Sequence, residues 1–231
     1  MIRSSKPART QAILPQSPPA ENLFLREVRE AMKKPFLFAA VIICLALPGF
    51  TWTKSLTPGL PWSVTLYEGG RLLALFAFVL MFFQFVLSSR IPWVERGLGP
   101  AALFKIHRRW GLIAFILILC HPTLLLVSER LQGYASALSP IKGVGVLTLV
   151  VLCVAVLAAL LSRRLHLKLK IWKRIHKVAY VVFPLGWVHS LIIGTTIQKG
   201  LARGLWFVLA AGYLAILAYK LVKGSQKRHP A

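Results

Sequence analysis

Two apolar stretches carry the feature that decides this fold: IHRRWGLIAFILILCHPTLLL at residues 106–126 and IHKVAYVVFPLGWVHSLII at residues 175–193. Each is about as long as a membrane span, which takes about 20 mainly apolar residues. Each also contains two histidines, and ionisable side chains at membrane depth are costly and are functional-site candidates by default. The four candidates are His107, His121, His176 and His189.

The chain as a whole is apolar, with 57% hydrophobic residues in 231 and a mean hydropathy of +0.67. Six segments are apolar enough to cross a bilayer: 35–53, 69–88, 106–127, 143–161, 172–193 and 204–222. We therefore predict an all-α fold, a six-transmembrane-helix bundle over residues 35–223.

Two tails flank this predicted domain, at residues 1–34 and 224–231. Residues 1–20 are rich in Pro, Ser and Ala and have no apolar run, which is typical of disorder and does not fit a secretory signal. Residues 21–34, ENLFLREVREAMKK, fit either a short interfacial helix or a charged tail.

The net charge is +23, and the positive residues are concentrated in alternate connections between the predicted spans. Of 29 Lys and Arg residues, 23 lie in the two tails, around the end of the sixth segment (Lys220 and Lys223) and in the connections 89–109 and 162–177. This is the positive-inside pattern, which predicts a protein of the cell (inner) membrane with both termini in the cytoplasm. The basic runs would also attract anionic lipid headgroups. We expect no nucleic-acid binding, because membrane spans separate the basic segments.

The sequence does not contain the residue patterns of several other kinds of functional site. Three single cysteines lie in three different spans, and neither a zinc site nor covalent haem attachment has that spacing. None of the six acidic residues falls inside a predicted span, and the chain has no Walker loop and no GxGxxG fingerprint.

Helical geometry predicts how the histidines lie. His107 and His121 are 14 residues apart, about 21 Å along a helix with an angular offset of about 40°. His176 and His189 are 13 residues apart, about 20 Å, but a straight helix would turn one by roughly 140° from the other. We therefore expect a helix distortion near Pro184, which lies between them.

The third and fifth spans run in the same direction, so His107 matches the depth of His176, and His121 matches that of His189. Imidazole is a standard axial ligand of haem iron, and bundle interiors are where such sites are built. This predicts two stacked haems, one per histidine pair. The alternatives are interhelical hydrogen bonding, interfacial basic residues, or a haem-free multi-pass transporter or channel with a histidine-lined path.

The segments ERGLGPAALFKIHRRWGLIAFILILCHP (95–122) and KRIHKVAYVVFPLGWVHS (173–190) resemble the ferric reductase-like transmembrane domain family. That family includes the membrane parts of NADPH oxidases and ferric reductases, and the haem-binding membrane subunit of the bacterial methionine sulfoxide reductase system. The resemblance spans about residues 67–222. It implies two haems b, each held by one histidine of the third helix and one of the fifth.

By that resemblance, His107 and His176 would be the axial iron ligands of a cytoplasmic-side haem, and His121 and His189 those of an outer haem. Arg71 lies where oxidase members carry an arginine beside the outer haem, although it is equally compatible with a flanking interfacial arginine. Propionates of the inner haem would have three further candidates: Arg108, Arg109 and Arg174.

The sequence departs from the family pattern in a feature that concerns the electron donor. Oxidases of the family continue into a flavin- and nicotinamide-binding domain, whereas this chain stops at Ala231. We expect an electron-transfer component of an oxidoreductase, in which FMN or FAD enters only through a partner. The donor would be a cytoplasmic flavin reductase or quinol, and the acceptor a ferric chelate, oxygen or a periplasmic protein.

Overall fold

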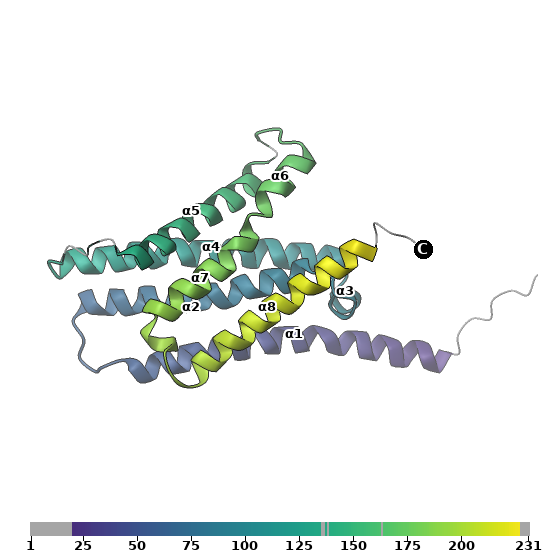
Figure 1. Cartoon of the computed structure of the whole chain (residues 1–231). Coiled ribbons are helices and arrows are strands. Elements are labelled where there is room, and N and C mark those ends of the chain that lie inside the picture. Colours follow the sequence, from purple (N-terminus) through teal and green to yellow (C-terminus); the bar gives the residue numbers. More distant parts are fainter. Residues whose placement is uncertain (1–19, 135–136, 138, 163, 227–231) are drawn as a thin grey trace, which may run out of the picture.

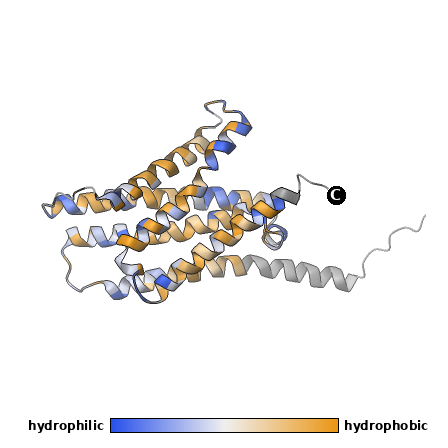
Figure 2. Ribbon diagram, viewed as in Figure 1, coloured by the Kyte–Doolittle hydropathy of each residue, from blue (hydrophilic) through white to orange (hydrophobic). Residues whose placement is uncertain are grey.

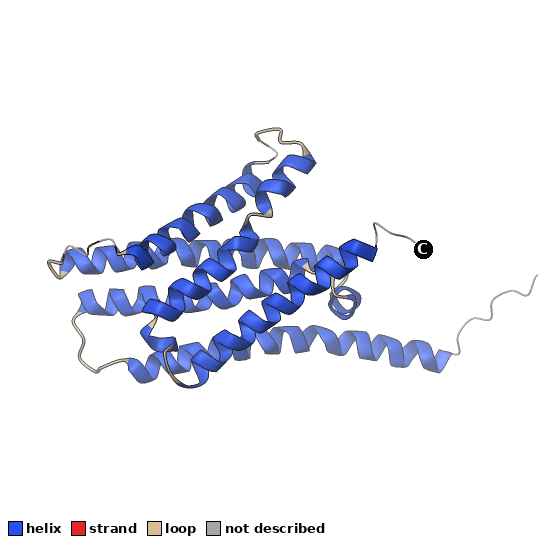
Figure 3. Cartoon of the chain, in the orientation of Figure 1, coloured by secondary structure: helices blue, strands red, loops and turns tan. Residues whose placement is uncertain are grey.

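The structure is a computed structural model that describes residues 20–134, 137, 139–162 and 164–226. Within these residues the chain consists of helices and loops, without a strand (Figure 3). In chain order the helices are α1 (Ala20–Ser55), α2 (Trp62–Ser88), α3 (Pro92–Leu98), α4 (Pro100–Leu131), α5 (Pro140–Leu161), α6 (Leu169–His176), α7 (Ala179–Ile193), the 3₁₀ helix η1 (Thr195–Ile197) and α8 (Gly200–Gln226).

All six predicted spans are confirmed as helices long and apolar enough to cross a membrane, with α6 and α7 together forming the fifth. The helices extend beyond the predicted apolar segments. The second begins at Trp62 rather than 69, and the third runs from Pro100 to Leu131 rather than from 106 to 127. The expectation that no acidic residue lies in a span was therefore wrong, because Glu68 belongs to α2 and Glu129 to α4.

Residues 21–34 do not form a separate helix. They are the beginning of α1, which continues without interruption into the first span. The side chains of residues 20–35 and the tail residues 1–19 and 227–231 lie outside what the structure describes, as does His229.

The α2–α4 and α5–α6 connections lie at the same end of the bundle as the start of α1 and the C-terminus (Figure 1). We call this the basic end, because its two connections, residues 89–109 and 162–177, carry 12 of the 29 Lys and Arg residues. Hydrophilic residues gather towards the two ends of the helices, and apolar ones occupy the middle (Figure 2). His166, in the α5–α6 connection, is exposed.

The core of the bundle is aromatic, with α2 as its most buried helix. The ring of Phe78 stacks on Phe183 at 4.7 Å between centroids and on Trp206 at 4.9 Å. Phe183 in turn stacks on Tyr213 at 4.7 Å. Lipid tails are as apolar as the side chains, so burial of apolar surface does not by itself drive helices together in a membrane. They associate through close packing and hydrogen bonds instead. This column of rings joins α2, α7 and α8 in that way.

Candidate functional site

The first histidine pair lies between α4 and the end of α6. The ring centroids of His107 and His176 are 6.3 Å apart and their planes are at 83°. A metal–imidazole bond is about 2 Å long and the ring centre lies about 1 Å behind the nitrogen, so two imidazoles on opposite sides of one iron have centres roughly 6 Å apart. The spacing of this inner pair fits a single iron between two rings.

The second pair lies further from the basic end. His121 belongs to α4, ten residues before its end at Leu131, and His189 belongs to α7. The two side chains are near enough to interact electrostatically. The structure thus brings the four histidines together in the combination that matched depth predicted. We call His121 and His189 the outer pair.

Three of the four rings are anchored by a backbone carbonyl of a neighbouring helix. His121 Nδ1 donates to the carbonyl oxygen of Gly70 at 2.9 Å, His176 Nδ1 to that of Ala155 at 3.0 Å, and His189 Nδ1 to that of Ile141 at 2.9 Å. A carbonyl oxygen can only accept, so each Nδ1 carries the proton and each Nε2 keeps its lone pair. A metal-ligating histidine is held in this way.

The fourth ring has a different partner. The Gln84 side chain of α2 is in contact with His107, and its amide nitrogen, when turned to α4, donates to the His107 carbonyl oxygen at 2.8 Å and to Nδ1 at 2.9 Å. The amide oxygen then accepts from the Gly111 amide at 3.3 Å. In this orientation Nδ1 accepts, whereas a ligand Nε2 would require Nδ1 to carry the proton. The amide oxygen would then have to turn to Nδ1, where it would also face the His107 carbonyl oxygen, another acceptor.

Each ligand helix is therefore supported by an antiparallel neighbour with matching spacing. On α2, Gly70 and Gln84 are 14 residues apart and contact two histidines of α4 that are also 14 apart. On α5, Ile141 and Ala155 are 14 residues apart and contact the two histidines of the α6–α7 span. Between α2 and α4 the spacings are equal, which keeps both contacts in register because antiparallel helices rise equally per residue. Between α5 and the α6–α7 span they differ by one residue, since His176 and His189 are 13 apart.

Two glycines leave room for the outer pair. A Cβ on Gly145 would lie 2.5 Å from His189 Cε1 and 2.9 Å from Nδ1, so the ring lies directly against the α5 backbone. A Cβ on Gly70 would collide with Leu125 and lie 3.1 Å from the His121 carbonyl oxygen. Larger residues at either position would displace the ligand helix or its ring.

The comparisons with known proteins agree with this geometry. The segment from residue 73 to residue 187, about half of the chain, matches the family model described as "Ferric reductase like transmembrane component". Residues 73–187 are a ferric reductase-like transmembrane domain. The chain is a multi-pass membrane protein, and the family indicates electron transfer in the membrane. Neither a curated protein nor a solved structure matches the chain significantly.

The matched segment includes three of the four histidines and ends at Trp187, two residues before His189. The case for His189 therefore depends on its anchored ring and on its position beside His121 rather than on the family match. Arg71 also lies outside the matched segment, two residues before its start.

The break in the fifth membrane-spanning segment lies at a different place from the one predicted. We expected a distortion near Pro184, but Pro184 lies inside α7, and the fifth span is interrupted at Lys177–Val178, directly after His176. The Tyr180 and Val181 amides donate three residues back, as in a 3₁₀ turn, which winds about 20° more per residue than an α-helix. This extra winding is in the direction that brings His189 towards the face of His176.

A distant hydroxyl relieves the effect of Pro184. Proline has no N–H, so the carbonyl four residues earlier loses its helical donor. That carbonyl belongs to Tyr180, and it accepts a hydrogen bond from Tyr213 of α8 at 2.6 Å. The helix can therefore continue through the proline.

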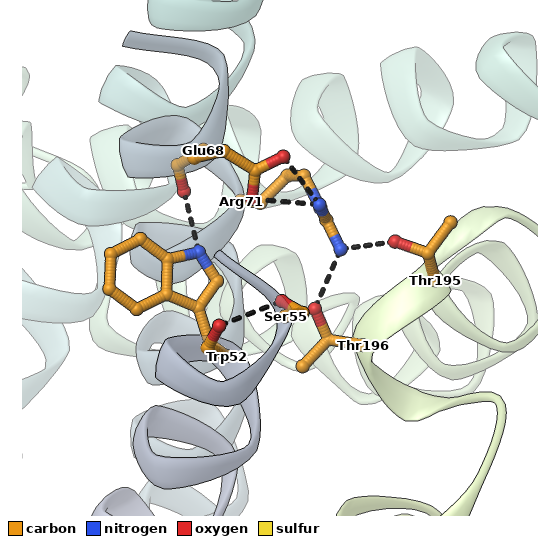
Figure 4. A network of polar contacts seen from close by, with 6 residues as sticks. All are labelled: Trp52, Ser55, Glu68, Arg71, Thr195 and Thr196. Atoms are coloured by element: carbon orange, nitrogen blue, oxygen red, sulfur yellow. Dashed lines mark hydrogen bonds and ion pairs between the residues drawn. The ribbon is translucent and has the colours of Figure 1, made fainter. Parts of the chain in front are cut away.

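Arg71 is held in a polar network at the end of the domain opposite the basic end (Figure 4). Its Nη1 donates to both carboxylate oxygens of Glu68, at 2.7 and 2.8 Å, and its Nη2 donates to the hydroxyls of Thr195 and, at 2.7 Å, Thr196. Trp52 of α1 donates to the Glu68 carbonyl at 3.0 Å. The network joins α1, α2 and η1. In this arrangement Arg71 has structural partners, and its predicted propionate role stays a prediction.

The other predicted arginines are not buried beside the histidines. Arg108, Arg109 and Arg174 are all exposed at the surface of the basic end. Sequence reasoning missed the residues that do support the site, namely Gln84, Gly70 and Gly145. Gln84 had a usable signal, because it is a polar residue in an otherwise apolar segment of α2 and lies 14 residues from Gly70.

Proposed function

We propose that this chain is a transmembrane electron-transfer protein that binds two haems b, one between His107 and His176 and one between His121 and His189. The observation that carries the proposal is the 6.3 Å spacing of the inner rings, combined with the anchoring of His176 Nδ1, which leaves Nε2 of that ring as the ligand atom. Bound haem supplies one-electron chemistry, because its iron cycles between the ferric and ferrous states.

The arrangement of the ligands favours electron transfer over catalysis at the iron. Each pair offers two imidazoles, and two imidazoles fill both axial positions, so no position is left for oxygen or another small ligand. Along α4 the two ligands are 14 residues apart, about 21 Å, which is most of a hydrocarbon core about 30 Å thick. Two such sites in series would carry an electron across the membrane.

The direction of transfer follows from charge. The basic end would face the cytoplasm of the cell, which places the inner pair on the donor side and the outer pair on the acceptor side. The chain would thus be a component of an oxidoreductase of the inner membrane, and its acceptor a ferric chelate, oxygen or a periplasmic protein.

The donor would dock at the basic end. Exposed cations surround the inner pair there, and such a one-signed surface attracts acidic proteins. We propose a soluble flavin reductase, which brings FMN or FAD, as the donor, with quinol as the alternative. The exposed cations are Arg96, Lys105, Arg108, Arg109, Lys173, Arg174 and Lys177.

A visible absorption spectrum of the purified protein, oxidised and then reduced, tests the proposal directly. We expect the spectrum of six-coordinate haem b and about two haems per chain after haem-replete expression. The exposed His166 gives a matched control, since His166→Leu should leave the spectrum and the haem content unchanged. A folded protein without any b-type signal would refute the proposed function.

A further inference from the structure

Lys220 is a cation of α8 whose side chain turns into the bundle. It lies three residues before the end of its span, from where a lysine normally extends towards water. Its Nζ instead donates to the hydroxyl of Tyr180 on α7 and to the hydroxyl of Ser88 on α2, the latter at 3.2 Å. The ammonium also lies 5.0 Å from the centroid of the Tyr180 ring. Three helices therefore meet at this one charge.

The charge of Lys220 has only neutral partners. Among the residues that the structure describes, the ion pairs are those of Arg71 with Glu68 and of Lys142 with Glu129, and none involves Lys220. A half-buried ammonium without a counter-ion is unfavourable at membrane depth, where charged residues normally pair. The position is suited to an anion that the protein chain does not supply.

Two hydrogen-bond donors remain available for that anion. The Lys220 ammonium has three N–H groups, and two are used by Tyr180 and Ser88. The Tyr180 hydroxyl accepts from Lys220 and keeps its own proton, for which the described residues offer no acceptor. The Ser88 hydroxyl is already used, because it donates to the Phe85 carbonyl at 3.2 Å. One ammonium and one phenol match the two oxygens of a carboxylate.

This cluster lies beside the inner histidine pair. Ser88 follows Gln84 by one helical turn of α2, and Gln84 contacts the His107 ring. Tyr180 follows His176 by four residues, and the Lys220 charge is close enough to interact electrostatically with His107. The three arginines that sequence reasoning assigned to the inner propionates are exposed, whereas Lys220 is half-buried and contacts Tyr180.

We propose that Lys220 and Tyr180 form a carboxylate-binding site for a propionate of the inner haem. This inference rests on the proposed function, because it needs a haem between His107 and His176. It assigns to α8, which supplies no iron ligand, the role of orienting the inner haem and of countering its negative charge.

The test compares two ligands that differ only in their carboxylates, haem and haem dimethyl ester. Apoprotein with His121→Leu, which should titrate only the inner site, is reconstituted with each ligand, with and without Lys220→Met. We expect Lys220→Met to weaken haem binding about tenfold, as for loss of a charge-assisted hydrogen bond. Binding of the ester should change little. Lys223→Met, on the same helix but directed to the Arg90 carbonyl and Tyr219, should leave both affinities unchanged.

Three results would overturn the inference. Equal weakening of both ligands by Lys220→Met would mean that Lys220 acts through packing. Anionic phospholipid that copurifies with the parent protein and is lost in Lys220→Met, with haem and ester affected alike, would identify a lipid phosphate as the anion. An unchanged affinity for both would mean that the charge has no partner in the haem. Failure of either ligand to bind the parent apoprotein would instead count against the proposed function.

A second variant, Tyr180→Phe, keeps the proposal testable if Lys220→Met does not fold. Tyr180→Phe removes only the free phenolic proton and should reduce the preference for haem over the ester by a few-fold. The inner haem should also become harder to reduce in Lys220→Met, because a nearby cation favours the less positive ferrous state. A preference unchanged in Tyr180→Phe would contradict the assignment, and so would an unchanged reduction potential in Lys220→Met.

Discussion

The inner and the outer histidine pair are held by different kinds of hydrogen bond. Both outer rings donate to backbone carbonyls, and His189 also lies flat against Gly145. In the inner pair His176 has a backbone carbonyl too, but His107 meets the side chain of Gln84. A backbone carbonyl can only accept and thus fixes the tautomer, whereas an amide can present either its oxygen or its nitrogen. The outer pair is therefore set by the backbone, and the inner pair depends on one side chain.

Removal of a ligand should have the largest effect and should separate the two pairs. His121→Leu or His189→Leu should halve the haem content and abolish reduction of external acceptors, while the inner haem stays reducible. His107→Leu or His176→Leu should remove the inner haem. Haem content per chain and optical redox titration measure both results.

His166→Leu is the control for these ligand variants, because His166 is exposed between α5 and α6. If His166→Leu halves the haem content and His176→Leu does not, the pairing of His107 with His176 is wrong.

Gly145→Ala should damage the outer pair alone. The new Cβ would lie 2.5 Å from His189 Cε1, so the ring must move and its hydrogen bond to Ile141 must weaken. We expect outer-haem affinity to fall by tenfold or more, in line with the loss of an anchoring bond to a ligand. Haem titration of the purified variant measures it.

Gly143→Ala is matched to this change on the same helix, since a Cβ there meets open space. Equal haem content in the two alanine variants would show that the glycine at 145 is not needed for the His189 ring.

Gln84→Leu should affect the inner pair more mildly. It removes the hydrogen-bond partner of His107 Nδ1 and makes the imidazole a weaker base, so the ferric state loses stabilisation and the inner reduction potential should rise. Inner-haem affinity should fall about tenfold. Gln84→Glu, which can only accept while ionised, should shift the potential the other way.

The outer haem provides the internal control for Gln84, because its ligands are anchored by backbone atoms. A redox titration in which Gln84→Leu shifts both potentials equally would contradict the contrast between the pairs.

The smallest expected effect concerns the approach of the donor to the inner pair. Reduction by a flavin reductase should slow several-fold as ionic strength rises from about 0.01 to 0.15 M, because screening shortens the range of the basic surface from about 30 to 8 Å. Stopped-flow absorbance at the haem bands measures the rate. A flat salt dependence, with quinol as the only competent donor, would reject docking at the basic end.

Much of the fold could be read from the sequence because each membrane helix must satisfy its own backbone and present apolar side chains to lipid. Hydropathy found all six spans, but not their ends. Glu68 lies within α2 although it is acidic, since Arg71 one turn later pairs with it and the threonines of η1 complete the network. That pairing depends on η1, which is more than 120 residues away in the chain.

The place of the helix break shows the same limit. Pro184 was the local signal, yet its unpaired carbonyl partner on Tyr180 is satisfied by Tyr213, 33 residues later. The break falls instead at Lys177–Val178, where no proline or glycine marks it.

The sequence by itself determined the helices, the depth of each histidine and the combination in which they pair, because these follow from rise per residue and chain direction. Only the tertiary structure decided which ring nitrogen is anchored, which glycine accommodates a ring and which cation turns inward. Lys220 and Arg108 look alike in sequence, and only the neighbouring helices make one point to Tyr180 and leave the other exposed. Hydrogen bonds and close contacts between helices depend on distances of a few ångströms, and those are set when the bundle packs.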